Sequence, residues 1–173
     1  MAKKILQTKR LILEELSEEH FQELYELLSN EKVHQYFPKT LNLEESKEFL
    51  EKVQRKYKEE GTSFWAVIRK EDNRFLGICG LLKQTVDGKE ELEVGYRIND
   101  GYWGRGYGTE AAAGCLEYAE KVLKKNSIIS LIREINYPSI RVAEKNNLKY
   151  EKNTMFNGFS HRVYRKRFIS SGE

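Results

Sequence analysis

The segment that decides the fold reads Gly101-Tyr102-Trp103-Gly104-Arg105-Gly106-Tyr107-Gly108-Thr109-Glu110-Ala111-Ala112. It holds four glycines within eight residues, and helix-forming sequence follows them directly. Glycine allows positive φ angles and lets backbone N–H groups approach a ligand without an intervening Cβ. A helix that begins immediately afterwards adds unpaired N–H groups and the positive end of its dipole. The segment therefore predicts a binding site for a phosphate or pyrophosphate, in preference to a simple surface turn.

The glycine segment joins a predicted strand to a predicted helix. After it, apolar residues recur at three- and four-residue spacing, as on one face of a helix: Ala111, Ala112, Cys115, Leu116, Ala119, Val122 and Leu123. Before it, residues 91–99 alternate between apolar and polar side chains, which predicts a strand. Gly95 inside this strand indicates either a bulge or a close backbone approach.

Two common phosphate-binding motifs with this outline do not fit. A Walker A loop requires Gly-Lys-Ser/Thr at its end, whereas this loop ends Gly108-Thr109-Glu110. A dinucleotide-binding fingerprint requires G-x-G-x-x-G, whereas the spacing over residues 104–108 is G-x-G-x-G. Neither of these two motifs therefore accounts for the loop.

The segment from Trp103 to Ala111 resembles the glycine motif of the GNAT superfamily of acyl-CoA N-acyltransferases. Within that superfamily it resembles most the ribosomal-protein N-terminal acetyltransferase branch, in which an aromatic residue precedes Gly-Lys/Arg-Gly-Tyr-Gly/Ala-Thr-Glu-Ala. Residues 93–96 are similar to the branch's Glu-Ile-Gly-Tyr, and residues 136–148 to its Asn-x-x-Ser-x-Arg-Val-x-Glu-Lys-x-Gly-Phe. The resemblance covers residues 8–168, so nearly the whole chain takes part in it.

The resemblance implies a single α/β domain over residues 1–173, with its core at residues 8–168 and a loose tail at residues 170–173. Its mixed central sheet would have about seven strands, splayed between the fourth and the fifth, with about four flanking helices. Periodicity places these strands near residues 11–13, 64–68, 75–82, 91–99, 128–132, 150–156 and 160–168. Cap signals at Ser17 and Asn42, the glycine loop, and Ser139 mark the starts of the helices.

The cofactor implied by the resemblance is acetyl-CoA. The backbone of residues 104–109 would hold the pyrophosphate, and the strand residues 96–98 would pair with the pantetheine amides. The full set of cofactor-binding residues is Tyr96, Arg97, Ile98, Trp103, Gly104, Arg105, Gly106, Tyr107, Gly108, Thr109, Asn136 and Ser139. For Asn136, a role as a helix cap or turn residue is the alternative, because it lies two residues before a proline.

Two residues are candidates for proton transfer. Glu93 would accept a proton from the amine, although alternation puts Glu91 on the same face of the strand and the pattern alone does not separate them. The resemblance selects Glu93. It also implies that Ser139 approaches the thioester sulfur. Ala143 occupies the position of the tyrosine acid used by many GNAT enzymes, so either Ser139 or a water molecule protonates the departing thiolate.

Composition narrows the possible partners. Charged residues make up 33% of the chain with a net charge of only +3, so no nucleic-acid partner is expected. No uninterrupted apolar run is long enough to span a membrane, and none follows Met1-Ala2-Lys3-Lys4 as in a secretion signal, so we expect a cytoplasmic protein. Cys79 and Cys115 look like buried apolar residues, and the scattered histidines suggest no metal site.

The sequence thus predicts an acetyl-CoA-dependent N-acetyltransferase that acts on a primary amine by direct transfer in a ternary complex. A peptide or protein N-terminal α-amine is the expected acceptor. Two alternatives stay open: a small-amine acetyltransferase for polyamines or antibiotics, and a CoA-binding sensor or assembly module without catalysis. Either a monomer or a homodimer is compatible with the sequence.

Overall fold

A long hairpin with Asp87 and Gly88 at its turn forms the centre of the sheet. Its strands are β4 (Arg74–Val86) and β5 (Lys89–Ile98), and they pair in unbroken register from Val86 opposite Lys89 to Gly77 opposite Ile98. Both turn residues have positive φ, 50° and 79°, as a two-residue hairpin turn requires. The unbroken register shows that β5 has no bulge toward β4 at Gly95. A Cβ added there would lie 3.3 Å from the Leu82 side chain, so it is a side chain that packs closely on Gly95.

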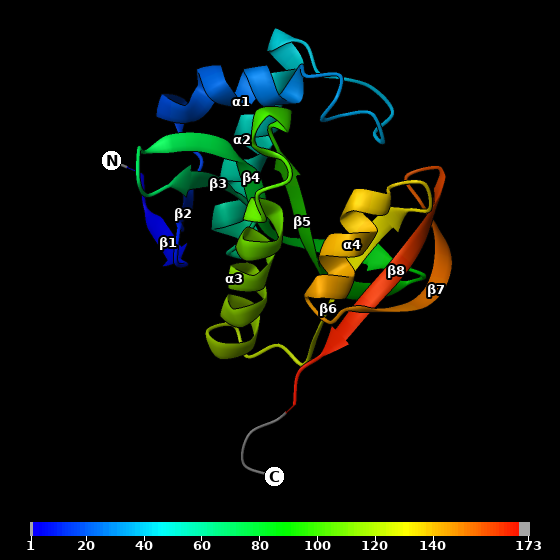
Figure 1. Cartoon of the computed structure of the whole chain (residues 1–173). Coiled ribbons are helices and arrows are strands. Elements are labelled where there is room, and N and C mark those ends of the chain that lie inside the picture. The colour runs from blue at the N-terminus through cyan, green and yellow to red at the C-terminus, as the bar shows by residue number, and fades with distance from the viewer. Residues whose placement is uncertain (1, 170–173) are drawn as a thin grey trace.

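The computed structural model describes residues 2–169, which form one mixed eight-stranded sheet with helices on both faces (Figure 1). The strand order is β1-β2-β3-β4-β5-β6-β8-β7. The remaining strands are β1 (Lys4–Gln7), β2 (Leu11–Glu15), β3 (Phe64–Arg69), β6 (Ser127–Arg133), β7 (Lys149–Phe156) and β8 (Phe159–Arg167). The expectation of about seven strands missed β1, a four-residue edge strand too short to show a period. The predicted loose tail lies outside the described residues.

The sheet opens between β5 and β6, the strands predicted as fourth and fifth. They run parallel and are registered at a single pair, Glu93 with Ile129. Beyond this pair, the Ser130 hydroxyl still donates a hydrogen bond to the Val94 carbonyl (3.2 Å). The opening leaves part of the β5 edge available to a ligand in the middle of the molecule.

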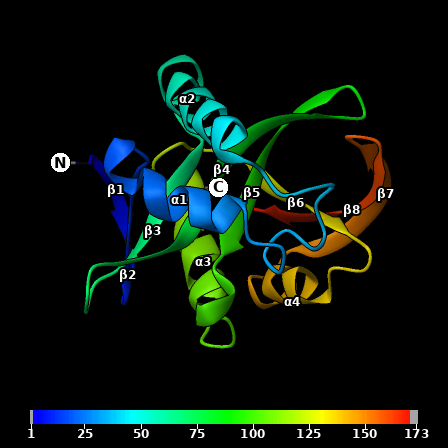
Figure 2. The same cartoon turned by 90° about the horizontal axis from the view of Figure 1, so that it is seen from above.

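Helices cover the two faces of the sheet separately (Figure 2). A short 3-10 turn (Glu18–His20), α1 (Phe21–Leu28) and α2 (Leu43–Glu60) pack on one face, where Leu24, Leu50 and Ile78 belong to one core cluster. On the other face, α3 (Tyr107–Lys121) and α4 (Tyr137–Lys145) share a second cluster. The sheet therefore divides the molecule into an α1–α2 side and an α3–α4 side.

The helix boundaries follow the signals in the sequence. Asn42, the predicted cap, forms a capping box with Glu45 at the start of α2, and Gly61 ends that helix with a φ of 85°. The fourth helix begins at Tyr137, two residues earlier than expected, with Pro138 in its first turn, where the missing N–H costs nothing. Local sequence thus sets the ends of these elements.

The start of α3 is hydrogen-bonded to the turn between β1 and β2. The Glu110 carboxylate accepts hydrogen bonds from the Thr8 hydroxyl (2.5 Å), the Arg10 backbone N–H (2.8 Å) and the Arg10 Nε (2.7 Å). Further along the helix, a Cβ added to Gly114 would lie 2.8 Å from the Thr8 side chain, so only glycine permits this close packing. These contacts fix the position of the glycine loop that precedes α3.

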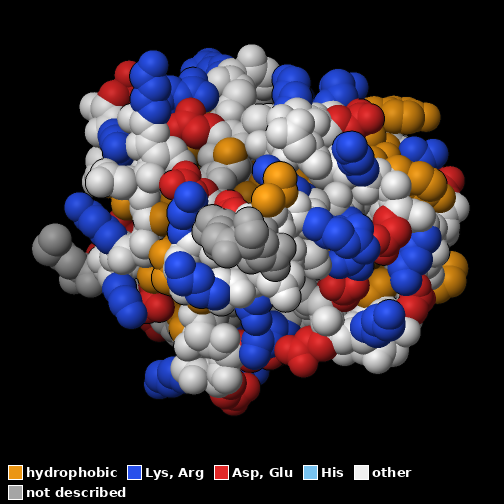
Figure 3. Space-filling model, turned by 90° about the horizontal axis from the view of Figure 1, so that it is seen from below, with side chains coloured by type: hydrophobic (Ala, Val, Ile, Leu, Met, Phe, Trp, Pro, Cys, Tyr) orange, Lys and Arg blue, Asp and Glu red, His pale blue; other side chains and the backbone are white. Residues whose placement is uncertain are grey.

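Charges on the surface are mixed. On the face drawn in Figure 3, Lys and Arg side chains lie among Asp and Glu side chains. The basic sequence around Arg165 lies on β8 between β6 and β7, and Arg165 is paired with Glu91 and Glu151. Within residues 2–169, no helix is long and apolar enough to cross a membrane. Cys79 and Cys115 are fully buried free thiols with sulfurs 3.6 Å apart.

Candidate active site

A cleft of about 920 Å³ occupies the opening between β5 and β6. It extends from the glycine loop at the start of α3 to the side chains of α2, so it passes from one side of the sheet to the other. Every residue that the sequence predicts for the cofactor or for catalysis lines this cleft, except Arg105. Arg105 lies exposed in the glycine loop.

The glycine loop has the conformation that its sequence predicts. Gly104 and Gly106 have φ angles of 78° and 81°, and α3 starts at Tyr107 with Gly106 as its N-cap. Because Gly106 has no side chain, the first N–H groups of α3 keep no side-chain cap. These N–H groups belong to residues that line the cleft, and the adjacent loop has no Cβ atom at Gly104 or Gly106. This arrangement fits the pyrophosphate of CoA.

Aromatic side chains hold both ends of this loop. The Trp103 indole N–H donates to the Ile98 carbonyl (2.7 Å), which ties the loop to the end of β5 and leaves the ring 46% exposed at the cleft. The Tyr107 ring lies 4.3 Å from the Arg10 guanidinium, and its hydroxyl accepts a hydrogen bond from Arg69 (3.2 Å). The loop is therefore preorganised before any ligand binds.

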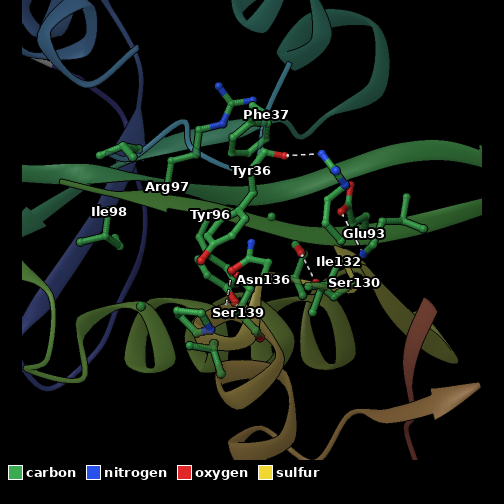
Figure 4. A pocket seen from close by; sticks show the side chains of 18 of the residues that line it. Tyr36, Phe37, Glu93, Tyr96, Arg97, Ile98, Ser130, Ile132, Asn136 and Ser139 are labelled. Carbon is green, nitrogen blue, oxygen red and sulfur yellow. Dashed lines mark hydrogen bonds between the residues drawn. The ribbon is translucent and has the colours of Figure 1, made fainter. Parts of the chain in front are cut away.

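Successive residues of β5 serve opposite sides of the sheet. Figure 4 shows Tyr96 pointing toward α4 and Arg97 pointing toward the α1–α2 connection. The Tyr96 hydroxyl donates to the backbone carbonyl of Ser139 (3.2 Å), so it fixes the first turn of α4 against β5. The cleft therefore has two halves, one beside Tyr96 and the glycine loop and one beside Arg97.

Glu93 lies near the point where β5 and β6 separate, and only 8% of the residue is exposed. One carboxylate oxygen accepts from the Gln84 side-chain amide (3.0 Å), and the other accepts from the Leu131 backbone N–H (3.2 Å). Burial raises the pKa of Glu93 to about 7, and the two hydrogen bonds and the Arg97 charge offset this only in part. A carboxylate with this pKa exchanges protons readily near neutral pH.

Asn136 and Ser139 meet at the start of α4. The Asn136 side chain accepts a hydrogen bond from the Ser139 backbone N–H (3.3 Å), which is the helix-cap role left open by the sequence. Both residues are half-buried and line the cleft. Among the described residues, none forms a hydrogen bond with the Ser139 hydroxyl, so this group is available to a ligand. Ala143, one turn later, is buried in the core.

A model of the acetyltransferase (GNAT) domain matches residues 10–149 of the chain, a range that includes β5, the glycine loop and the whole of α4 with its cap. The chain belongs to the GNAT acetyltransferase family. The match spans well over half of the sequence and agrees with the sheet opening, the glycine loop and the cleft described above. The protein is therefore an acetyl-CoA-dependent acetyltransferase, and the alternative of a non-catalytic CoA-binding module is set aside.

Similarity to individual proteins supports the membership of this family. The chain is 34% identical to the uncharacterized protein YkkB of Bacillus subtilis, over 87% of this chain and 88% of the relative. It is 31% identical to the uncharacterized N-acetyltransferase YnaD of the same organism, over 83% of this chain and 82% of that relative. Among solved structures, RimL, a ribosomal alpha-N-protein acetyltransferase, superposes with a TM-score of 0.81 at 15% identity, covering 97% of this chain and 96% of RimL. RimL has also been solved with coenzyme A.

Several residues of the GNAT cleft were not predicted. Gln84 could have been found, because a two-residue turn at Asp87-Gly88 places Gln84 opposite Glu91 and diagonal to Glu93. Phe37 and Phe49 line the cleft beside Arg97, and His34 contacts Arg97 without lining the cleft; all three come from the α1–α2 side and have no local signal in the sequence. Their role depends on tertiary packing alone.

A cluster outside the GNAT cleft brings together Glu14, Glu19 and His20 within 4.8 Å. The His20 ring accepts a hydrogen bond from the Ser17 backbone N–H and lies 2.8 Å from a Glu14 oxygen. His20 therefore helps to connect the 3-10 turn to β2, and this structural role explains the cluster.

Proposed function

We propose that this enzyme transfers the acetyl group of acetyl-CoA to a primary amine, with a peptide or protein N-terminal α-amine as the acceptor. The observation that carries the proposal is the buried Glu93 carboxylate in the cleft, with a pKa of about 7. A base of this strength suits an α-amine, whose own pKa is about 7.7–8.0.

The acceptor's pKa separates the candidate amines. At pH 7.4, forming the neutral nucleophile costs about 0.5–1 kcal/mol for an α-amine and about 4 kcal/mol for a lysine side chain. Glu93 would have to supply this difference without help from a second carboxylate, since it is the only carboxylate among the described residues that line the cleft. The less demanding α-amine therefore fits the site better.

The binding of acetyl-CoA would use the residues predicted for it. The N–H groups of residues 104–109 would hold the pyrophosphate, and the free edge of β5 at residues 96–98 would pair with the pantetheine amides. Part of that edge is already used, because the Ile98 carbonyl accepts from Trp103. Asn136 would contact the cofactor arm from its place at the start of α4.

In a direct transfer, the acetyl group moves from the thioester to the amine in one step. The amine nitrogen forms a bond with the acetyl carbonyl carbon, the carbon–sulfur bond breaks, and the amine proton passes to Glu93. The departing thiolate takes a proton from the Ser139 hydroxyl or from water. Direct transfer needs no acetyl-enzyme intermediate, and neither cysteine lines the cleft, since Cys79 of β4 and Cys115 of α3 are both fully buried in the core. This is what supports a ternary complex.

The test is an acceptor panel read out by thiol release from acetyl-CoA and by the mass of the product. One peptide carries a free N-terminus and blocked lysines, and its matched partner carries a blocked N-terminus and one free lysine; spermidine and an aminoglycoside complete the panel. We expect the highest kcat/KM for the free N-terminus. A clear preference for spermidine or the aminoglycoside would overturn the peptide acceptor, and no thiol release with any amine would overturn the transfer itself.

A cytoplasmic location and a monomeric or homodimeric state remain predictions from the sequence. Sedimentation of the purified protein with and without CoA would measure the oligomeric state directly.

A further inference from the structure

Two donors from different strands hold the Glu93 carboxylate. The Gln84 side-chain amide on β4 donates to one oxygen (3.0 Å), and the Leu131 backbone N–H on β6 donates to the other (3.2 Å). Within residues 2–169, Gln84 is the only side chain that forms a hydrogen bond with this carboxylate. The Glu93 side chain is therefore held between the two strands that flank β5.

The Leu131 contact has a structural explanation. β5 and β6 are registered at a single pair, Glu93 with Ile129, and the Leu131 N–H lies two residues further along β6. At the point where the strands separate, a backbone donor needs an acceptor, and an oxygen of Glu93 supplies it. This role uses only one carboxylate oxygen. The hydrogen bond from Gln84 to the other oxygen therefore needs an explanation of its own.

Gln84 reaches Glu93 diagonally across the central hairpin. In the register of β4 with β5, Leu82 lies opposite Glu93, and Gln84 lies opposite Glu91. Diagonal neighbours on one face of a sheet are within reach of long side chains. Gln84 is half-buried and lines the cleft, whereas the next residue, Lys83, lies on the other face of β4 and does not line it.

The two hydrogen bonds leave positions on the carboxylate for an amine. A carboxylate offers about four acceptor positions. The described residues use two of these positions, one on each oxygen of Glu93. With both oxygens held, the carboxylate plane has a fixed orientation, and its remaining positions point in fixed directions. A proton acceptor that is already oriented raises the rate, because less freedom is lost when the amine arrives.

Charged groups on neighbouring elements act on Glu93 without contacting it. The Arg97 charge on β5 lowers the pKa of Glu93 and offsets part of the rise that burial causes. The other charged or titratable side chains on the surrounding elements are Glu91, Lys52 and Lys56 of α2, Arg133 of β6, and His161 and Arg165 of β8. None of them forms a hydrogen bond or ion pair with Glu93 in the part of the chain that the structure describes. A variant of Gln84 leaves all of these groups in place.

We propose that Gln84 is a positioning residue for the transfer, and that its amide holds the Glu93 carboxylate in the orientation and the ionised form that accept the amine proton. This inference rests on the proposed role of Glu93 as the base. Gln84 itself takes no proton, since the proton passes from the amine to Glu93. A neutral amide orients a carboxylate without cancelling its charge. A cation in the same place would form an ion pair, as Arg165 does with Glu91.

Gln84→Met tests this role, because methionine has a similar length and no hydrogen-bond donor. With one N-terminal peptide as acceptor, we expect kcat at high pH to fall about 10-fold, since the carboxylate is no longer oriented. The acidic limb of the pH profile should move up by about one pH unit, because the ionised form loses a hydrogen bond. The KM for acetyl-CoA should stay at the wild-type value. Lys83→Met, on the other face of β4, is the matched control and should keep the wild-type profile.

Gln84→Lys shifts the profile in the opposite direction. Lysine keeps a donor and adds a positive charge, so it favours the ionised form of Glu93 and moves the acidic limb to lower pH. A side chain that only fills space would not give opposite shifts for methionine and lysine. Folding of each variant is checked by the rise in Tm that CoA gives. If Gln84→Met fails this check, Gln84→Lys carries the test, and an unchanged acidic limb then overturns the inference.

The double variant Gln84→Met/Glu93→Gln shows whether Gln84 acts through Glu93. We expect Gln84→Met to lower kcat in the wild-type background and to have no further effect in Glu93→Gln. A loss of the same size in both backgrounds would overturn the inference, because Gln84 would then act on the acceptor or on the fold. A wild-type kcat and pH profile for Gln84→Met would also overturn it.

The single variant Glu93→Gln separates this inference from the proposed function. If Glu93→Gln lowers the rate at pH 7 but Gln84→Met has no effect, the base role of Glu93 stands and only the positioning role of Gln84 is wrong. A wild-type rate for Glu93→Gln would instead overturn the base role, and the inference with it.

Discussion

Glu91 and Glu93 point to the same face of β5, yet only one of them is neutralised by a cation. Glu91 forms an ion pair with Arg165, which also binds Glu151. Glu93, two residues along, meets only the Gln84 amide and the Leu131 N–H, and it is 8% exposed in the cleft. An ion-paired carboxylate is a poor base, because its charge is already stabilised, whereas a buried carboxylate without a cation holds its proton near neutral pH. The two glutamates that the sequence pattern left equivalent thus differ in environment.

The first prediction concerns the glycine loop. CoA at 100 times its dissociation constant should stabilise the wild-type fold by about 2.7 kcal/mol, which raises Tm by roughly 5–10 °C for a domain of this size. Gly106→Val should abolish the shift, since Gly106 has a φ of 81° and its N–H neighbours must approach the ligand. Differential scanning fluorimetry measures both.

Gly61→Val is the matched control for the loop variant. Gly61 has a similar φ of 85° at the end of α2 and does not line the cleft, so this variant shares the backbone strain. It should have a lower Tm but keep the CoA-induced shift. If millimolar CoA leaves the wild-type Tm unchanged, the assignment of the loop to pyrophosphate is wrong.

A second prediction follows from the buried state of Glu93. Its pKa is raised from 4.5 to about 7 in the folded state, so the native protein holds a proton there that the unfolded chain has lost. The free energy of unfolding therefore decreases by about 3 kcal/mol as pH rises from below 4.5 to above 7. Glu93→Gln has no ionisable group at this position. Its free energy of unfolding relative to wild type should therefore increase by about 3 kcal/mol between pH 4.5 and pH 7.

Urea titrations of both proteins at several pH values measure this difference, in which the titrations of all other groups largely cancel. A constant difference between Glu93→Gln and wild type from pH 4.5 to pH 8 would show that Glu93 ionises as an ordinary exposed carboxyl group.

Ser139 provides a third prediction. Ser139→Ala should lower kcat by about 10²-fold or less, because the thiolate then takes its proton from water, while the KM values stay close to wild type. Ser139→Thr keeps a hydroxyl and is the control for the loss of the proton donor. Stopped-flow measurement of thiol release follows the step directly. Unchanged kcat in Ser139→Ala at every pH would assign the proton to water alone.

Many turns and helix ends of the fold could be predicted from local sequence. The glycine loop, the Asp87-Gly88 turn, the Asn42 cap and the end of α2 at Gly61 are each set by residues within a few positions of each other, and the loop and the cap were predicted. The edge strand β1 was not predicted, because four residues are too few to show an alternating pattern. Its contacts with α3 come from residues about 100 positions away.

Part of the candidate site could likewise be predicted from the sequence, and part could not. Motif residues place Glu93, the loop and the start of α4 in one cleft, as expected. The environment of Arg97 was not predictable, because His34, Phe37 and Phe49 approach it from distant segments. The family resemblance implied a role for Arg97 only through its backbone, whereas its side chain faces the other half of the cleft.

The central claim is that Glu93 is the general base, and the pH dependence of kcat/KM for one N-terminal peptide tests it most directly. Glu93→Gln should keep the CoA-induced shift in Tm and reduce the rate at pH 7 by roughly 10²–10⁴-fold. The loss should shrink as pH rises, because the amine then deprotonates unaided. Glu91→Gln, the control on the same face, should stay near the wild-type rate. A wild-type rate for Glu93→Gln at pH 7 would contradict the account.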